Sequence, residues 1–144
     1  MLVGTTNGVP MIKDIRTTGP RDLRAILSGK HILVVEDDPV VAVDYRIQLQ
    51  AIGITQTLQP TIRRALAYLA DHDVDAAIVD NQLPDGTCER VVAELMRRHI
   101  PFIVVSGDTF GMRETGGAPV LTKPVRPDEV RDNLAAVIAD HSAS

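Results

Sequence analysis

The sequence predicts an α/β domain in which helices cover both faces of a parallel β-sheet. Short apolar runs rich in β-branched residues alternate along the chain with longer segments whose apolar residues recur at helical spacing. The runs are too short for globular helices, and turn residues follow them. Because a helical segment separates each strand from the next, the strands are expected to lie parallel.

Length and composition favour one globular domain in the cytoplasm. At 144 residues the chain can bury a real core, and 44% hydrophobic with 24% charged residues is the composition of a folded protein. A net charge of -4 and the lack of a basic run argue against a nucleic-acid partner. The sole cysteine, Cys88, fits a reducing compartment, and the sequence shows neither a signal peptide nor a membrane-spanning stretch.

Residues 1–29 are expected to form an N-terminal extension to a domain that covers residues 30–144. A short amphipathic helix is predicted near residues 20–28, because Pro20 suits a first helical turn and Gly29 suits a helix end. Two interpretations of this helix stay open: a leader packed on its own domain, or a segment that binds a partner or forms a homodimer.

Three acids follow the first predicted strand, residues 30–35, and one of them has a structural role. Asp38 is a favourable N-cap and Pro39 a favourable first helical residue, so a helix is expected from there to Gly53. Glu36 and Asp37 have no such role, and two carboxylates at a strand end repel each other unless a cation or a proton neutralises them. The helix carries several apolar residues: Val40, Val41, Val43, Ile47, Leu49 and Ile52.

The remaining segments continue the alternation of strand and helix. The alternation also predicts a helix at residues 108–117. Glycines and weak apolar periodicity in this segment indicate that the helix is short or irregular. The other expected strands are residues 54–58, 74–79, 101–105 and 118–122, and the other expected helices are residues 61–72, 87–98 and 127–139.

Chemically distinctive side chains stand at the ends of four predicted strands: Glu36 and Asp37, Asp80, Ser106, and Lys123. Open α/β sheets bind ligands at the carboxyl ends of their strands. A trio of carboxylates can hold Mg²⁺, and a lysine with a hydroxyl can complete a cradle for a phosphoryl group. In that setting Asp80 can attack phosphorus as a nucleophile. Ordinary alternatives exist: Asp80 as a cap of the next turn, Ser106 as a common surface residue, and Lys123 as a solvated strand end.

Four motifs together resemble the receiver domain of two-component response regulators. They are the run ILVVEDDP at residues 32–39, Val79-Asp80 with LPDG at residues 83–86 behind it, Val105-Ser106-Gly107, and Lys123-Pro124. They occur in the expected order over about residues 30–140. The resemblance implies a flavodoxin-like sheet of five parallel strands in the order 2-1-3-4-5, between helices.

The resemblance also implies a role for each residue of the candidate site. Asp80 would be the phospho-acceptor, Ser106 the switch hydroxyl, and Lys123 the residue that binds the phosphoryl group. Mg²⁺ would be held by Glu36, Asp37, Asp80 and the backbone carbonyl of Gln82. The implied partner is a sensor histidine kinase or a histidine phosphotransfer protein. Such a domain is not an enzyme beyond catalysing its own phosphorylation and dephosphorylation.

Two departures from the usual receiver pattern resemble an atypical alphaproteobacterial group in which the fourth helix is reduced or mobile. Val120 stands three positions before Lys123, where receivers usually carry an aromatic residue that reports phosphorylation. The segment between Ser106 and Lys123 is short and rich in glycine, and Pro101-Phe102 stands at the start of the fourth strand.

The expected function is that of a single-domain response regulator that signals by protein–protein interaction, because the length leaves no residues for an output domain. One alternative is a phosphorelay intermediate that passes its phosphoryl group to a histidine phosphotransfer protein. Another is a degenerate receiver used for binding only, against which the intact acidic set argues. The third is an aspartyl-phosphate phosphatase of haloacid-dehalogenase type, but Leu83 stands where its nucleophile should precede Asp85-Gly86-Thr87.

Overall fold

The computed structural model describes residues 20–107 and 115–143, and in these residues the predicted fold class is confirmed. Five parallel strands form one sheet in the order β2-β1-β3-β6-β7, which is 2-1-3-4-5 when these strands are counted along the chain. At the carboxyl end of the sheet, Asp80 is in register with Val105, and Ser106 is in register with Thr122. The strands are β1 (His31–Val35), β2 (Thr55–Gln59), β3 (Ala76–Asp80), β6 (Phe102–Ser106) and β7 (Val120–Thr122).

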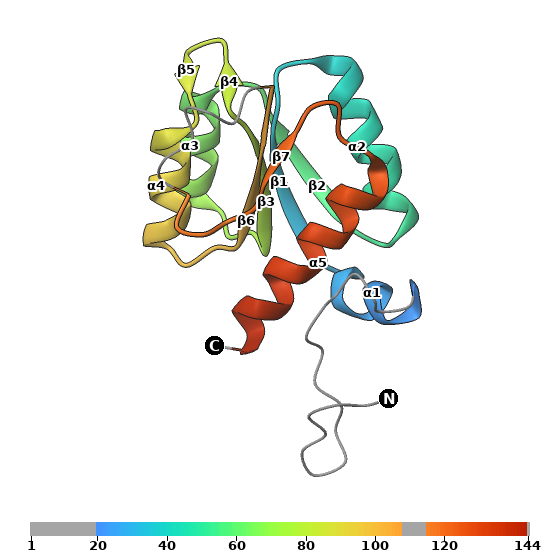
Figure 1. Cartoon of the computed structure of the whole chain (residues 1–144). Coiled ribbons are helices and arrows are strands. Elements are labelled where there is room, and N and C mark those ends of the chain that lie inside the picture. The colour runs from blue at the N-terminus through green and yellow to red at the C-terminus, as the bar shows by residue number, and fades with distance from the viewer. Residues whose placement is uncertain (1–19, 108–114, 144) are drawn as a thin grey trace.

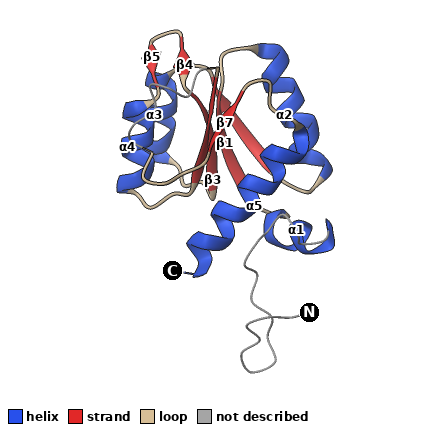
Figure 2. Cartoon of the chain, in the orientation of Figure 1, coloured by secondary structure: helices blue, strands red, loops and turns tan. Residues whose placement is uncertain are grey.

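Helices cover both faces of this sheet (Figure 1, Figure 2). α2 and α5 lie on one face and α3 and α4 on the other. Each face has its own apolar core, and β1 contributes to both because its side chains alternate: Ile32 and Val34 join one cluster, while Leu33 and Val35 join the other. The helices are α1 (Pro20–Leu27), α2 (Pro39–Ala51), α3 (Ile62–Asp71), α4 (Glu89–Arg97) and α5 (Pro127–Ala143).

α2 begins as the sequence predicts. The Oδ1 atom of Asp38 accepts hydrogen bonds from the backbone N–H groups of Val40 at 2.9 Å and Val41 at 3.4 Å, so this acid is an N-cap. The helix ends at Ala51, and Gly53 beyond it has φ of +83°, in the left-handed region that favours glycine. The predicted structural role of Asp38 is therefore confirmed.

A small hairpin follows β3, where only turn residues were predicted. It consists of β4 (Gln82–Leu83) and β5 (Gly86–Thr87) in antiparallel pairing, and α4 begins only after it, at Glu89 instead of residue 87. Asp85 at its tip accepts hydrogen bonds from the backbone N–H groups of Ile62 at 2.9 Å and Arg63 at 3.0 Å. These bonds lower the pKa of Asp85 and attach the hairpin to the start of α3.

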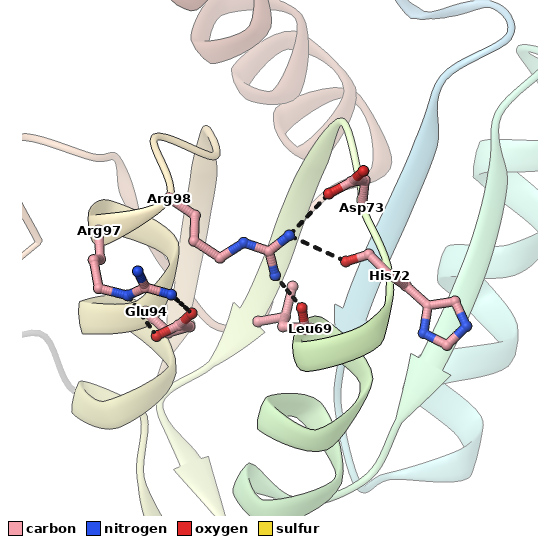
Figure 3. A network of polar contacts seen from close by, with 6 residues as sticks. All are labelled: Leu69, His72, Asp73, Glu94, Arg97 and Arg98. Carbon is pink, nitrogen blue, oxygen red and sulfur yellow. Dashed lines mark hydrogen bonds and ion pairs between the residues drawn. The ribbon is translucent and has the colours of Figure 1, made fainter.

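Arg98 joins α3 and α4 at the opposite end of these helices (Figure 3). Its guanidinium donates to the carbonyl oxygens of Leu69 and, at 3.3 Å, of His72, and it pairs with the Asp73 carboxylate at 2.9 Å. A cation at this position satisfies the last carbonyl groups of α3. Arg97, by contrast, pairs at 2.5 Å with Glu94 of its own helix.

α1 packs on the domain that follows it. Leu23 and Leu27 are buried in the same core cluster as side chains of α2 and α5, and Arg24 donates to the carbonyl oxygen of Ala51 at 3.3 Å. The apolar side of α1 is thus used within its own chain. The boundary between an N-terminal extension (residues 1–29) and a domain that begins at residue 30 stays a prediction. The formation of a homodimer stays a prediction as well.

The connection between β6 and β7 contains the segment for which a short or irregular helix was expected. Residues 108–114 of that segment lie outside the described part of the chain. The described residues on either side, Gly107 and 115–119, are not helical. Over all described residues, no helix combines the length and apolarity needed to cross a membrane.

Candidate functional site

The structure brings four of the predicted site residues together at the carboxyl ends of β1, β3 and β7. Carboxylate oxygens of Glu36, Asp37 and Asp80 lie within 4.8 Å of one another. The Lys123 ammonium lies 3.0 Å from Oδ2 of Asp80. The site therefore combines three acids and one cation at or directly after the ends of strands.

Asp80 is the buried centre of this cluster. Asp80 is 3% exposed. Its two carboxylate oxygens have different hydrogen-bond partners. Oδ2 accepts from Lys123, and Oδ1 accepts from the backbone N–H of Gln82 at 3.2 Å. The backbone N–H of Lys123 donates to the carbonyl oxygen of Ser106 at 2.9 Å, so the sheet itself places the lysine beside Asp80.

Glu36 is a deeply buried acid of this cluster. It is 2% exposed; its Oε2 atom accepts from the backbone N–H of Asp38 at 3.1 Å, whereas its buried Oε1 atom has no hydrogen-bond partner within the described residues. Burial raises the pKa of Glu36 to about 7, the N–H of Asp38 opposes that rise, and the nearby Asp80 carboxylate adds to it. Burial therefore favours the protonated form of Glu36 relative to a solvated glutamate.

The donor set fits Mg²⁺. This ion prefers hard oxygen ligands, and the cluster offers three carboxylates, one with an oxygen that lacks a hydrogen-bond partner within the described residues. Glu36, Asp37 and Asp80 would hold the ion. Gln82 lies two residues after Asp80 in the sequence. That its backbone carbonyl is a further Mg²⁺ ligand stays a prediction.

Lys123 keeps its positive charge in this environment. Burial lowers the pKa of its ammonium group, but the hydrogen bond to Asp80 and the charges of Asp80, Glu36 and Asp37 together raise it above the ordinary value. A permanently charged donor beside the acceptor carboxylate can meet phosphoryl oxygens as they gain charge.

Ser106 ends β6 at the same edge and is 1% exposed. Its Oγ atom accepts a hydrogen bond from the Asn81 side chain at 3.4 Å, and Asn81 in turn contacts Cys88. Asn81 was not predicted from the sequence, although its place directly after Asp80 at a buried strand end was an available signal. Tyr45 of α2 was missed as well; its pKa is raised by burial and then by the charges of Glu36 and Asp80.

The phosphatase alternative finds no support in this geometry. Leu83, at the place of its nucleophile, is an apolar residue buried in the core cluster beneath α3 and α4. The Asp85 carboxylate is held by the backbone of α3. The local DGT sequence therefore belongs to a structural hairpin.

The fold and the acidic site define a phospho-acceptor signalling domain of the α/β class. The family described as "Response regulator receiver domain" matches residues 32–135, and the chain belongs to this family. Receiver domains partner with histidine kinases in two-component signalling.

Curated relatives agree with this family. The KDP operon transcriptional regulatory protein KdpE of Escherichia coli (strain K12) is 28% identical over 120 residues, covering 79% of this chain and 53% of that protein. The transcriptional regulatory protein TcrA of Mycobacterium tuberculosis is 30% identical over 126 residues, covering 83% and 50%. The chain thus spans about half the length of these relatives.

Solved structures show the same fold. The response regulator PhyR from Brucella abortus superposes with a TM-score of 0.71 at 23% identity, over 85% of this chain and 53% of that one. A CheY-like receiver domain from Methanospirillum hungatei JF-1 gives a TM-score of 0.70 at 21% identity, over 79% and 97%.

Proposed function

We propose that this domain accepts a phosphoryl group on Asp80 from a phosphohistidine, with Mg²⁺ bound at Glu36, Asp37 and Asp80. The observation that carries the proposal is the position of the Asp80 carboxylate, which is buried between a lysine and two further acids at the edge of the sheet. The donor is a sensor histidine kinase or a histidine phosphotransfer protein.

The transfer is a substitution at phosphorus. An oxygen of the Asp80 carboxylate forms a bond to phosphorus, the bond from phosphorus to the imidazole nitrogen breaks, and the imidazole leaves with the electron pair of that bond. Lys123 offsets the charge of the phosphoryl oxygens, and Glu36 and Asp37 hold the metal in place. Mg²⁺ held there would supply Lewis-acid stabilisation of the developing negative charge. Hydrolysis of the acyl phosphate restores the carboxylate and releases inorganic phosphate.

An exposed apolar surface begins beside this site. Val40, Val43 and Ile47 on α2 are 71%, 44% and 60% exposed. Their spacing places them along one side of α2. The first residue of this helix directly follows the acidic residues 36–38. We infer that this apolar stripe receives a helix of the protein that carries the phosphohistidine, because a donor must contact this side of the domain to reach Asp80.

The finer features of the function are proposals as well. We propose a cytoplasmic, single-domain regulator of the atypical alphaproteobacterial group, whose output is a protein–protein contact and not nucleic-acid binding. What supports this is the sequence: Val120 replaces the usual aromatic residue, and no basic run is present. A phosphorelay intermediate would use the same site and stripe, but it would return the phosphoryl group to a histidine.

Intact-mass spectrometry after incubation with acetyl phosphate tests the acceptor role. The parent should gain one phosphoryl group with Mg²⁺ and none with a chelator, and Asp80→Asn should gain none. Labelling of Asp80→Asn to the extent of the parent would contradict the proposal. Steady turnover of an added phosphomonoester by the parent would favour the phosphatase.

The apolar stripe has its own test. Ile47→Glu should slow transfer from a phosphorylated histidine kinase that labels the parent, while labelling by acetyl phosphate stays at the parent rate because the small donor needs no docking surface. Leu58→Glu on β2, also an exposed apolar position at 40%, is the matched control. Equal loss in both variants would remove the assignment to α2.

A further inference from the structure

Three buried polar side chains beside Asp80 form a chain that joins β3, β6 and α4. Asn81 follows Asp80 and is 9% exposed, Ser106 ends β6 and is 1% exposed, and Cys88 precedes α4 and is fully buried. The Asn81 Nδ2 atom lies 3.4 Å from Ser106 Oγ, and the Cys88 Sγ atom lies 3.3 Å from Asn81 Oδ1. The three groups thus have one continuous path of polar contacts.

The chemistry of the groups gives this path a direction. An amide oxygen only accepts and an amide nitrogen only donates, so the thiol donates to Asn81 Oδ1 and Asn81 Nδ2 donates to Ser106 Oγ. The Ser106 oxygen therefore points a lone pair at Asn81, and its single proton must go to a different acceptor. A buried amide that lost either partner would pay a desolvation penalty, which favours this one orientation.

Cys88 is suited to the first position of the path. Burial raises the pKa of its thiol to about 11, and the negative charges of Glu89 and Asp80 act in the same direction. The thiol stays protonated at neutral pH and therefore remains a donor. As the residue before α4 it makes no side-chain capping bond to that helix, so its S–H is available to donate to Asn81.

We propose that Asn81 is a positioning residue for the phosphorylation of Asp80, which orients the Ser106 hydroxyl so that its O–H is directed away from Asn81 and toward a phosphoryl oxygen. Cys88 holds the amide of Asn81 in the orientation that this requires. The inference rests on the proposed function of Asp80 as the acceptor and adds two residues to the site.

The rate of labelling by acetyl phosphate tests the proposal. In this reaction the bond from phosphorus to the acetyl oxygen breaks, acetate leaves, and an oxygen of Asp80 takes the phosphoryl group. Cys88→Ala removes the donor and should slow labelling about three- to tenfold, the value of one neutral hydrogen bond. Cys88→Ser keeps a donor and should stay within about twofold of the parent. Mg²⁺ affinity, measured by calorimetry, should be the same in all three proteins.

A double-mutant cycle separates positioning from packing. If Asn81 acts through Ser106, Asn81→Leu should slow labelling in the parent but have no further effect in a Ser106→Ala background. If the rate reductions caused by Asn81→Leu and Ser106→Ala multiply in the double variant, the proposal is overturned. It is also overturned if Cys88→Ser is labelled as slowly as Cys88→Ala. If Asn81→Leu does not fold, the two Cys88 variants decide alone. A parent that gains no phosphoryl group at all refutes the proposed function itself, before any variant is compared.

Discussion

Replacing Glu36 by Gln tests whether burial and repulsion among the acids destabilise the metal-free domain. Burial and the neighbouring carboxylate raise the pKa of Glu36 from 4.5 to about 7. The folded protein therefore keeps a proton that the unfolded chain releases as pH rises above 4.5. The stabilisation linked to that proton is complete below the unfolded pKa and is lost as pH rises to about 7. The total loss is of the order of 3 kcal/mol.

Urea unfolding of the metal-free proteins between about pH 5 and about pH 8 measures this effect. Glu36→Gln carries no titrating group at this position, so the parent should lose stability relative to the variant as pH rises. Comparing the two proteins removes the contribution of titrating residues that do not interact with Glu36. A free-energy difference that does not change with pH would refute the assignment of the raised pKa to Glu36.

Mg²⁺ should reverse the same trend. A divalent ion needs the ionised form of Glu36, so below about pH 7 its apparent affinity for the parent should fall by about tenfold per pH unit. At saturating Mg²⁺ the parent should be more stable than Glu36→Gln at about pH 8, because the variant lacks one ligand charge. Equal Mg²⁺ binding by both proteins would show that Glu36 is not a ligand.

Three further substitutions test other contacts. Lys123→Ala should leave Mg²⁺ binding intact but abolish most of the spectral change on addition of beryllofluoride, and an unchanged response would remove its role at the phosphoryl group. Arg98→Ala should cost about 1–3 kcal/mol in urea unfolding because carbonyls at the end of α3 lose their donor. The control Arg97→Ala should cost less than about 0.5 kcal/mol, and equal costs would contradict the capping role. Leu27→Ala should cost about 2–5 kcal/mol if α1 is part of the core, and a value near zero would make α1 dispensable.

Local patterns in the sequence were enough to predict the sheet and the meeting of its acids. The alternation of strand and helix led to the α/β class, and the resemblance led to the strand order that the structure shows. Glu36, Asp37, Asp80 and Lys123 meet because the carboxyl ends of parallel strands share one edge. Their chemical roles stay predictions.

Contacts between segments that are distant along the chain could not be predicted from the sequence. Asp85 caps α3 from 23 positions further along the chain, and Arg98 satisfies carbonyls at the other end of that helix. The hairpin strands after Asp80 have two residues each, too few for a periodic signal. The pairing of Asn81 with Ser106 depends on the register of two neighbouring strands.

The sequence also could not predict which face of α2 is buried. Apolar residues occur all around this helix, so periodicity does not separate inside from outside. The structure buries Ala42, Tyr45 and Leu49, and it leaves Val43 and Ile47 exposed. An apolar side chain that faces solvent gives the same sequence signal as one in the core, although only the first is available to a partner.

Chemical location of the phosphoryl group tests the central claim most directly. Borohydride reduces an aspartyl phosphate to homoserine, and tandem mass spectrometry of the digested protein locates that residue. After incubation with acetyl phosphate and Mg²⁺, we expect homoserine at position 80 and unmodified aspartate at Asp37 and Asp85. Homoserine at either of those positions, or at none, would contradict the assignment of Asp80 as the acceptor.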